Sequence, residues 1–211
     1  MKLQITAYVA ATKRREPLIA KHLVGHPHHL HFGSDTSVLP PDYPLPGLPP
    51  NLKRDPRKLL GHYRAWNNHR FMAQLFLSLG ADLGLFFEDD AVPNRPDWVR
   101  IVNKSVYYGD LFDVFNFHGR QMLPDQWHVM TDEHNAVSNI WVKKPATKVR
   151  CYGSLAYFLN RRSARALAAK DFDGTPIDVF LPNLGTFACM VPSPFDHDRS
   201  QGSLVDHAKP H

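Results

Sequence analysis

Hydrophobic and polar residues alternate at the start of the chain and then change to a helical spacing. Residues 3–10 alternate, which is the pattern of a strand with one buried face. Residues 14–24 carry apolar side chains at helical spacing, and Pro17 suits the first turn of a helix. Residues 29–32 form a second short strand pattern, which Gly33 closes. The strand, the helix and the second strand together predict a βαβ unit and therefore a parallel sheet.

Residues 38–56 are rich in proline and show neither periodicity. Seven prolines fall between Pro40 and Pro56, and proline lacks the amide hydrogen that helices and inner strands need. We predict an extended surface loop here, which is either a lid or acceptor loop or a passive excursion. Helical spacing of apolar residues returns over residues 57–79, and Gly80 predicts the end of that helix.

A short apolar run over residues 83–87 leads directly into three acids, Glu88, Asp89 and Asp90. Bulky apolar residues bounded by glycine and charge predict a buried strand. Beyond this point the pattern predicts a helix over 95–106 and a strand over 112–117, then an irregular segment over 118–150 with one short strand at 140–142. It further predicts strands over 152–159 and 186–191 and helices over 161–170 and 178–184. Residues 193–211 are predicted to be a polar, loop-like tail.

The order of these elements predicts an α/β fold with a mostly parallel central sheet flanked by helices, in the Rossmann-like manner. A chain of 211 residues fits one domain. We therefore expect a single catalytic domain over 1–211 that carries the Pro-rich loop and the polar tail as elaborations.

Composition removes several classes of protein. An apolar share of 43%, with 11% aromatic residues, excludes a disordered chain. The sequence has no apolar run of about 18 residues, so no membrane span is expected. The first residues form too short an apolar run for a signal peptide. Cys151 and Cys189 lack Cys-x-x-Cys spacing and suggest no disulfide framework. A cytoplasmic location is the expectation.

The net charge of +5 predicts mild attraction to polyanions, such as nucleotide-linked substrates, anionic glycans or nucleic acid. The basic residues occur mainly as separate pairs rather than in one long run. Solvated surface charge is therefore the competing interpretation for most of them.

The three acids are the first candidate site. Ligands of open α/β sheets bind at the carboxyl ends of the strands, where this cluster is expected. Clustered carboxylates repel one another and need a cation or a proton to lie together. Mg²⁺ and Mn²⁺ take oxygen ligands and often bridge to phosphates. The cluster is thus either a metal site that holds a diphosphate or a solvated turn that caps the next helix.

Four ordered segments resemble glycosyltransferase family 25, the group that includes the bacterial lipooligosaccharide sugar transferases and is related to the collagen galactosyltransferases. Gly61 begins the first, in the place where the family usually has Ser. The four segments are Gly-His-Tyr-Arg-Ala-Trp at 61–66, Phe-Glu-Asp-Asp-Ala-Val at 87–92, Tyr-Gly-Ser-Leu-Ala-Tyr-Phe-Leu-Asn-Arg-Arg-Ser-Ala at 152–164, and Pro-Ile-Asp-Val-Phe-Leu at 176–181.

The resemblance spans roughly residues 57–204 and implies a GT-A type fold. It implies a nucleoside diphosphate sugar as donor, which we expect to be a UDP-sugar, and inverting transfer to a hydroxyl group. A cell-surface glycan is the acceptor that the family suggests. A hydroxylated base in DNA or a protein side chain stays open, because the chain is basic.

A bound Mn²⁺ or Mg²⁺ would stabilise the charge that gathers on the leaving diphosphate. Asp90 is the first choice as direct metal ligand and Glu88 the second, because positions 88 and 90 share a face if the strand continues that far. Asp89 is expected to contact the ribose, or the metal through water. The GT-A resemblance implies a late ligand near the diphosphate, for which we propose His197; the alternative is a surface histidine.

The remaining roles also follow from the resemblance. Asp178 is the candidate base for the acceptor hydroxyl, or else the N-cap of the helix that begins there. Arg14 or Arg15, in the loop after the first strand, is expected to pair with the diphosphate, and Arg199 is an alternative phosphate ligand. His62 is expected to support the donor site, unless it is a buried structural histidine.

Two further classes of protein stay open. A metal-dependent nucleotidyltransferase would use the same carboxylates but would release pyrophosphate. A non-catalytic module that binds nucleic acid or glycans would bind no nucleotide in a metal-dependent way.

Overall fold

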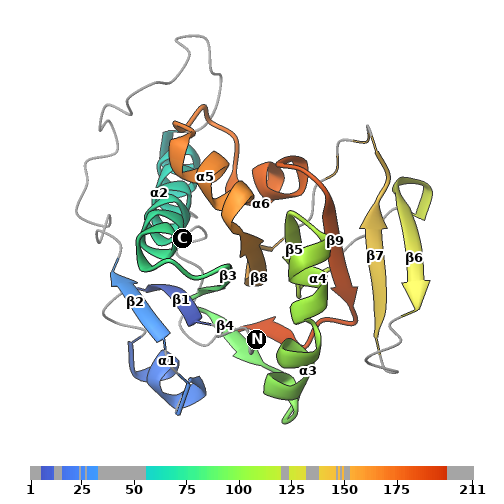
Figure 1. Ribbon diagram of the computed structural model, residues 1–211. Helices are drawn as coiled ribbons and strands as arrows, with labels where there is room; N and C mark the ends of the chain where they lie inside the picture. Colours follow the sequence, from blue (N-terminus) through green and yellow to red (C-terminus); the bar gives the residue numbers. More distant parts are fainter. Residues whose placement is uncertain are drawn as a thin grey trace, which may run out of the picture.

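The fold is described by a computed structural model, in which one sheet with helices on both faces makes up most of the described part of the chain (Figure 1). The residues described are 6–11, 16–23, 25, 26, 28–32, 56–119, 124–131, 138–145, 147, 149 and 153–198. Most of the predicted Pro-rich loop, the end of the predicted tail and the candidate residues Arg14, Arg15 and Arg199 lie outside them.

The first strands form the predicted βαβ unit. Strand β1 (Thr6–Ala11) is followed by helix α1 (Glu16–His22) and strand β2 (His28–Phe32), and β2 pairs with β1 in parallel. Strand β3 (Leu83–Glu88) pairs in parallel with the other side of β1. The predicted parallel opening of the sheet is thus confirmed.

Helix α2 (Pro56–Leu79) confirms the long helix predicted before the acidic cluster. Its buried side chains recur at helical spacing and face the sheet, among them Trp66, Met72 and Phe76. Gly80 follows with a φ of 77°, a left-handed conformation that glycine adopts at low cost and that ends the helix.

The middle of the sheet is not parallel as predicted. Strand β8 (Ala156–Asn160) lies between β3 and β5 (Val114–Asn116) and is antiparallel to both. Strand β9 (Phe187–Val191) then pairs with β5 in parallel. Periodicity cannot reveal strand direction, because a strand buried on both faces shows the same apolar run in either orientation.

The segment predicted as irregular contains a hairpin at the edge of the described sheet. Strand β6 (Trp127–Thr131) follows the short 3-10 helix η3 (Pro124–Gln126), and it pairs with β7 (Asn139–Lys143), which pairs with β9. The irregular assignment was therefore wrong for residues 127–131, whereas the short strand predicted at 140–142 lies within β7 and is confirmed. In β6 only Trp127 is buried, so its sequence lacks the alternation that predicts a strand. The strand order is β2-β1-β3-β8-β5-β9-β7-β6.

The helix predicted over 95–106 is two helices, α3 (Trp98–Lys104) and α4 (Val106–Leu111). Ser105 separates them, and its hydroxyl donates to the carbonyl of Ile101 at 2.8 Å. The predicted loop-like tail was also wrong at its start, where strand β10 (Phe195–His197) pairs with β4 (Ala91–Pro93) in a second, antiparallel sheet.

Three helical elements complete the fold. Helix α5 (Arg161–Ala169) begins at Asn160, whose side chain accepts a hydrogen bond from the Ser163 amide at 3.0 Å. Helix α6 (Ile177–Phe180) runs into the 3-10 helix η4 (Leu181–Asn183), which leads to β9.

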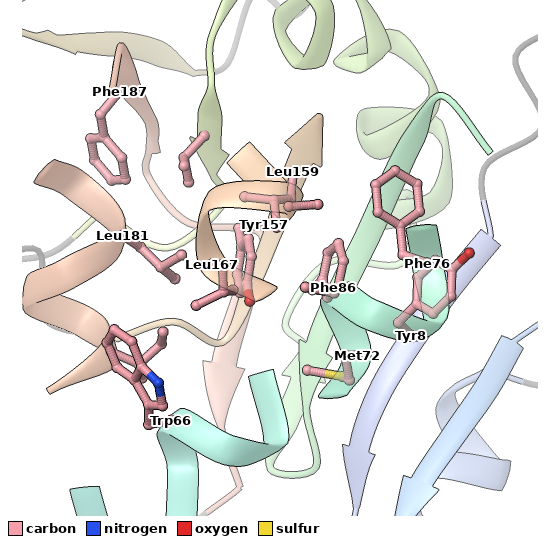
Figure 2. Close-up of a cluster of buried hydrophobic side chains, with 14 of the residues drawn as sticks. Tyr8, Trp66, Met72, Phe76, Phe86, Tyr157, Leu159, Leu167, Leu181 and Phe187 are labelled. Atoms are coloured by element: carbon pink, nitrogen blue, oxygen red, sulfur yellow. The ribbon is translucent and has the colours of Figure 1, made fainter. Parts of the chain in front are cut away.

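Alternating residues of the inner strands build one core on each face. Helices α2, α5 and α6 cover one face, and α1, α3 and α4 cover the other (Figure 1). On the first face, Tyr8, Phe86 and Tyr157 stack across three neighbouring strands, with ring centroids 5.2 Å and 5.3 Å apart (Figure 2). This row of three stacked rings, here called the aromatic ladder, packs beneath the carboxyl end of β3.

No helix in the described part of the chain combines the length and the apolar character that a membrane crossing requires.

Candidate functional site

The candidate site lies where β3 ends. Glu88 is the last residue of β3, Asp89 and Asp90 form a turn, and β4 follows directly. Because β4 pairs with β10, the turn is brought to residues far along the chain. The amide of Asp198 donates to the carbonyl of Asp90 at 2.7 Å. The acidic cluster therefore has a second wall, built from the segment after β9.

Asp90 and His197 meet at this junction although 107 positions separate them. The His197 Nδ1 atom lies 3.0 Å from Asp90 Oδ2, and both side chains are half-buried. Behind them, the ring of His118 packs edge-on against His197 with centroids 5.4 Å apart. His118 Nδ1 is 3.2 Å from the carbonyl of Phe195, so it helps to fix the strand that carries His197.

Glu88 turns the other way, toward α2. Its Oε1 atom lies 3.3 Å from His69 Nε2 and accepts a short hydrogen bond from the Ser154 hydroxyl. Its backbone amide donates to the carbonyl of Leu155 at 2.9 Å. Glu88 and Asp90 therefore do not share a strand face, because β3 ends at Glu88 and the chain turns at Asp89 and Asp90.

The surroundings keep the Glu88 side chain ionised. Burial alone would raise the pKa of its carboxyl group, but hydrogen bonds and charge from His69, the Ser154 hydroxyl and the nearby His197 together hold that pKa below its ordinary value. Burial, and then the negative charge of Glu88, raise the pKa of Tyr157 well above 10. The site thus pairs a carboxylate with a phenol that keeps its proton.

Three predicted metal ligands do not converge on one point. Among the described residues, no group of three or more His, Cys, Asp and Glu side chains is placed to hold a metal ion. Asp90 and His197 still offer one oxygen and one nitrogen 3.0 Å apart. Two adjacent ligands of an octahedral ion at about 2.1 Å lie about 3.0 Å apart, so these two atoms are spaced as adjacent ligands of such an ion would be.

The other sequence-predicted residues are placed as follows. Asp89 lies half-buried in the turn between its two neighbours, and His62 lies half-buried on α2. Asp178 occupies the first turn of α6, whose N-cap is Pro176, so the N-cap interpretation of Asp178 was wrong. Helix α6 packs on α2, where Phe180 contacts Trp66 with ring centroids 4.6 Å apart. Asp178 therefore lies in a helix on the α2 face of the sheet.

Sequence reasoning missed His69, Ser154 and His118, which support the acids. His69 follows His62 by seven positions and so shares its side of α2, and this spacing was the available signal. Ser154 stands in the segment that resembles the family, but its partner is set by the pairing of β8 with β3. His118 lies in a segment without periodicity.

A small cavity adjoins Glu88 on the α1 side of the sheet. Its volume is about 20 Å³, and His22, Glu88, Trp98 and Phe195 are among its lining residues. That is room for one water molecule. Burial and Lys21 lower the pKa of His22, while Asp198 opposes this shift. The end of α1 therefore lies beside the segment that carries His197.

Comparisons with known proteins add one distant likeness. No model of a known protein family matches the chain, and no curated protein matches it. Among 22 matching chains of solved structures is the crystal structure of A197 from STIV, with 12% identity, a TM-score of 0.47, and coverage of 92% of this chain and 85% of that one. A likeness of this degree supports no conclusion about activity.

Proposed function

We propose that this protein is a metal-dependent glycosyltransferase of the GT-A type, which transfers a sugar from a nucleoside diphosphate sugar to a hydroxyl acceptor. One observation carries the proposal: Asp90, after a buried strand, and His197, from a distant segment, lie 3.0 Å apart at the carboxyl end of that strand. Ligand sites of open α/β sheets occur at this edge. The resemblance to glycosyltransferase family 25 supports the same assignment.

Asp90 and His197 are the side chains that would hold Mn²⁺ or Mg²⁺. The bound ion would supply positive charge next to the diphosphate leaving group. Glu88 contributes a fixed negative charge on the α2 side of the same turn. Asp89 is proposed to face the donor ribose. Two protein ligands suffice, because such ions commonly keep water and phosphate oxygens in their other positions.

The other proposed roles concern the donor phosphates and the acceptor. Arg14, Arg15 and Arg199 would pair with the diphosphate as charge-assisted donors. Asp178 would accept the proton of the acceptor hydroxyl, as an inverting transfer requires. The donor is proposed to be a UDP-sugar, and the acceptor a glycan or a hydroxylated base in DNA, to which the net charge of +5 gives general attraction.

Product analysis tests the proposal. The protein is incubated with a panel of UDP-sugars and Mn²⁺, with glycan or hydroxymethylated DNA as acceptor, and the nucleotide products are separated by anion-exchange chromatography. We expect free nucleoside diphosphate, and at least a tenfold loss of it in Asp90→Asn. Asp82→Asn is the matched control, because Asp82 is exposed at the start of β3. Release of pyrophosphate from nucleoside triphosphates instead would indicate a nucleotidyltransferase.

A further inference from the structure

A chain of three polar groups leads from the core to the acidic cluster. The Tyr157 hydroxyl lies 2.6 Å from His69 Nδ1, and His69 Nε2 lies 3.3 Å from Glu88 Oε1. Exposure rises along the chain, from Tyr157 at 0% and His69 at 1% to the Glu88 side chain at 26%. Figure 2 shows Tyr157 within the apolar cluster from which this chain starts.

Chemistry fixes the protons in this chain for a neutral imidazole ring. The Glu88 carboxylate can only accept, so His69 Nε2 carries the hydrogen. His69 Nδ1 is then an acceptor and receives the Tyr157 hydroxyl hydrogen. In this arrangement the Tyr157 hydroxyl and His69 Nε2–H each have an acceptor.

Both hydrogen bonds that Glu88 accepts fall on the same oxygen. His69 and Ser154 contact Oε1, and among the described residues none hydrogen-bonds Oε2. The loop that carries Ser154 is itself held, because Asn116 donates to the Gly153 carbonyl at 2.9 Å. The two carboxylate oxygens are therefore unequal: Oε1 is anchored by two side chains, and Oε2 accepts no hydrogen bond from the described residues.

The rest of α2 shows that a polar residue at this position is not needed for packing. The neighbouring inward-facing residues, Met72, Ala73 and Phe76, are apolar and buried against the aromatic ladder. A buried polar ring stabilises only when its partners are present, and it costs about 1–3 kcal/mol when one is missing. A histidine at position 69 is thus explained by its two polar partners, Tyr157 and Glu88, rather than by apolar packing.

We propose that His69 is a positioning residue, which, with Tyr157 behind it, fixes the orientation of the Glu88 carboxylate so that Oε2 faces the ligand. That the ligand is a metal-bound nucleotide rests on the proposed function, whereas the fixed orientation of Glu88 does not. Side chains that orient the groups of a metal site commonly change metal affinity or activity 10–100-fold when replaced.

Two amide replacements separate the two ring nitrogens of His69. In His69→Gln, the amide can take the place of Nε2–H and donate to Glu88. In His69→Asn, the shorter amide can take the place of Nδ1 and accept from Tyr157, but it cannot reach Glu88. Both variants lose part of the chain, so a purely structural role predicts similar losses in both.

The first measurement needs no ligand. In the full chain labelled with ¹³C at the glutamate carboxyl carbons, the Glu88 signal is assigned by its absence in Glu88→Gln. We expect the same Glu88 shift in wild type and His69→Gln, and a displaced shift in His69→Asn. An identical Glu88 shift in all three proteins would overturn the proposal.

The second measurement is calorimetric titration with UDP in the presence of Mn²⁺. We expect affinity within about threefold of wild type in His69→Gln, and a loss of about 10–100-fold in His69→Asn. Equal affinity in both variants would overturn the positioning role. If wild type itself binds no nucleoside diphosphate, the proposed function fails, and the carboxyl signal alone decides the role of His69.

Discussion

Replacement of Asp113 should destabilise the protein more than any exposed acid does. Asp113 lies directly before β5, at the end of the strands opposite the candidate site, and its side chain is 5% exposed. Its carboxylate accepts hydrogen bonds from the Arg162 guanidinium, from the Thr186 amide at 2.9 Å and from the Ser163 hydroxyl at 3.2 Å. One carboxylate thus ties together the starts of β5, α5 and β9.

The size of the effect follows from what each group does afterwards. In Asp113→Ala the Thr186 amide and hydroxyl both lose their acceptor, whereas Ser163 keeps a bond to Asn160 at 3.0 Å and Arg162, 77% exposed, returns to water. We expect a loss of about 3 kcal/mol in the free energy of unfolding, because several hydrogen bonds to an ionised carboxylate are lost. The midpoint of thermal unfolding should fall by roughly 6–12 °C.

The same carboxyl group should make stability depend on pH. Burial would raise the pKa of Asp113, but hydrogen bonds from Arg162, Thr186 and Asn160 lower it from 3.8 to about 2. A lowered pKa stabilises the fold above the unfolded value of 3.8 and loses that effect as pH falls through about 2. The shift corresponds to about 2 kcal/mol, reduced to roughly 1–2 kcal/mol by screening of the exposed Arg162.

Urea unfolding of wild type and Asp113→Asn at pH 7, 5, 4 and 3 measures this term. The difference between the two proteins should be constant from pH 7 to pH 5 and fall to about half by pH 3. Asp110→Asn, an exposed acid on α4, should show no such difference. A difference between wild type and Asp113→Asn that stays the same at pH 7 and pH 3 would show that ionisation of Asp113 does not stabilise the fold.

Two further predictions concern buried positions. Gly153 has a φ of 105°, and a Cβ there would lie 2.6 Å from His118 Cδ2, so Gly153→Ala should lower the thermal midpoint by several degrees more than Gly25→Ala. Gly25 has a similar φ of 76° but no atom within 4 Å, which makes it the matched control; equal losses would contradict the steric argument. Among the described residues the buried Tyr8 hydroxyl has no hydrogen-bond partner. Tyr8→Phe should therefore leave the free energy of unfolding unchanged or raise it by up to about 1 kcal/mol. A lower free energy of unfolding in urea would indicate that the Tyr8 hydroxyl has a stabilising partner.

Local periodicity was sufficient for the elements that decide the first part of the sheet. The alternation around β1 and the helical spacing of α2 are visible in the sequence because each element has one apolar face. The apolar run that leads into the acids predicted β3, whereas its end at Glu88 became clear only in the structure. These predictions depended only on neighbours within one element.

Elements that depend on distant partners could not be predicted in this way. The antiparallel direction of β8 is set by pairing with β3 and β5, and β10 is a strand only because β4 lies beside it. A segment of three residues, such as Phe195–His197, carries too little periodicity to separate a strand from a loop.

In the candidate site, too, the contacts between distant residues could not be predicted from local sequence. The contact of Asp90 with His197 was anticipated through a family resemblance, because no local pattern links residues 107 positions apart. The partnership of His69 with Glu88 follows from how α2 docks on the sheet. A histidine on an apolar helix face has many structural explanations in sequence alone, so only the packed geometry identified this one.

Thermal stabilisation by nucleotides tests the proposed nucleotide site at Asp90 and His197. The melting midpoint is measured with uridine, guanosine, cytidine and adenosine diphosphates, with and without Mn²⁺, for wild type, Asp90→Asn and the control Asp82→Asn. At 100 times the dissociation constant a ligand adds about 2.7 kcal/mol of stability, a midpoint shift of several degrees. We predict a shift with one nucleotide, dependent on Mn²⁺, kept in Asp82→Asn and lost in Asp90→Asn. No shift with any nucleotide would contradict the account and leave the three acids as a structural turn.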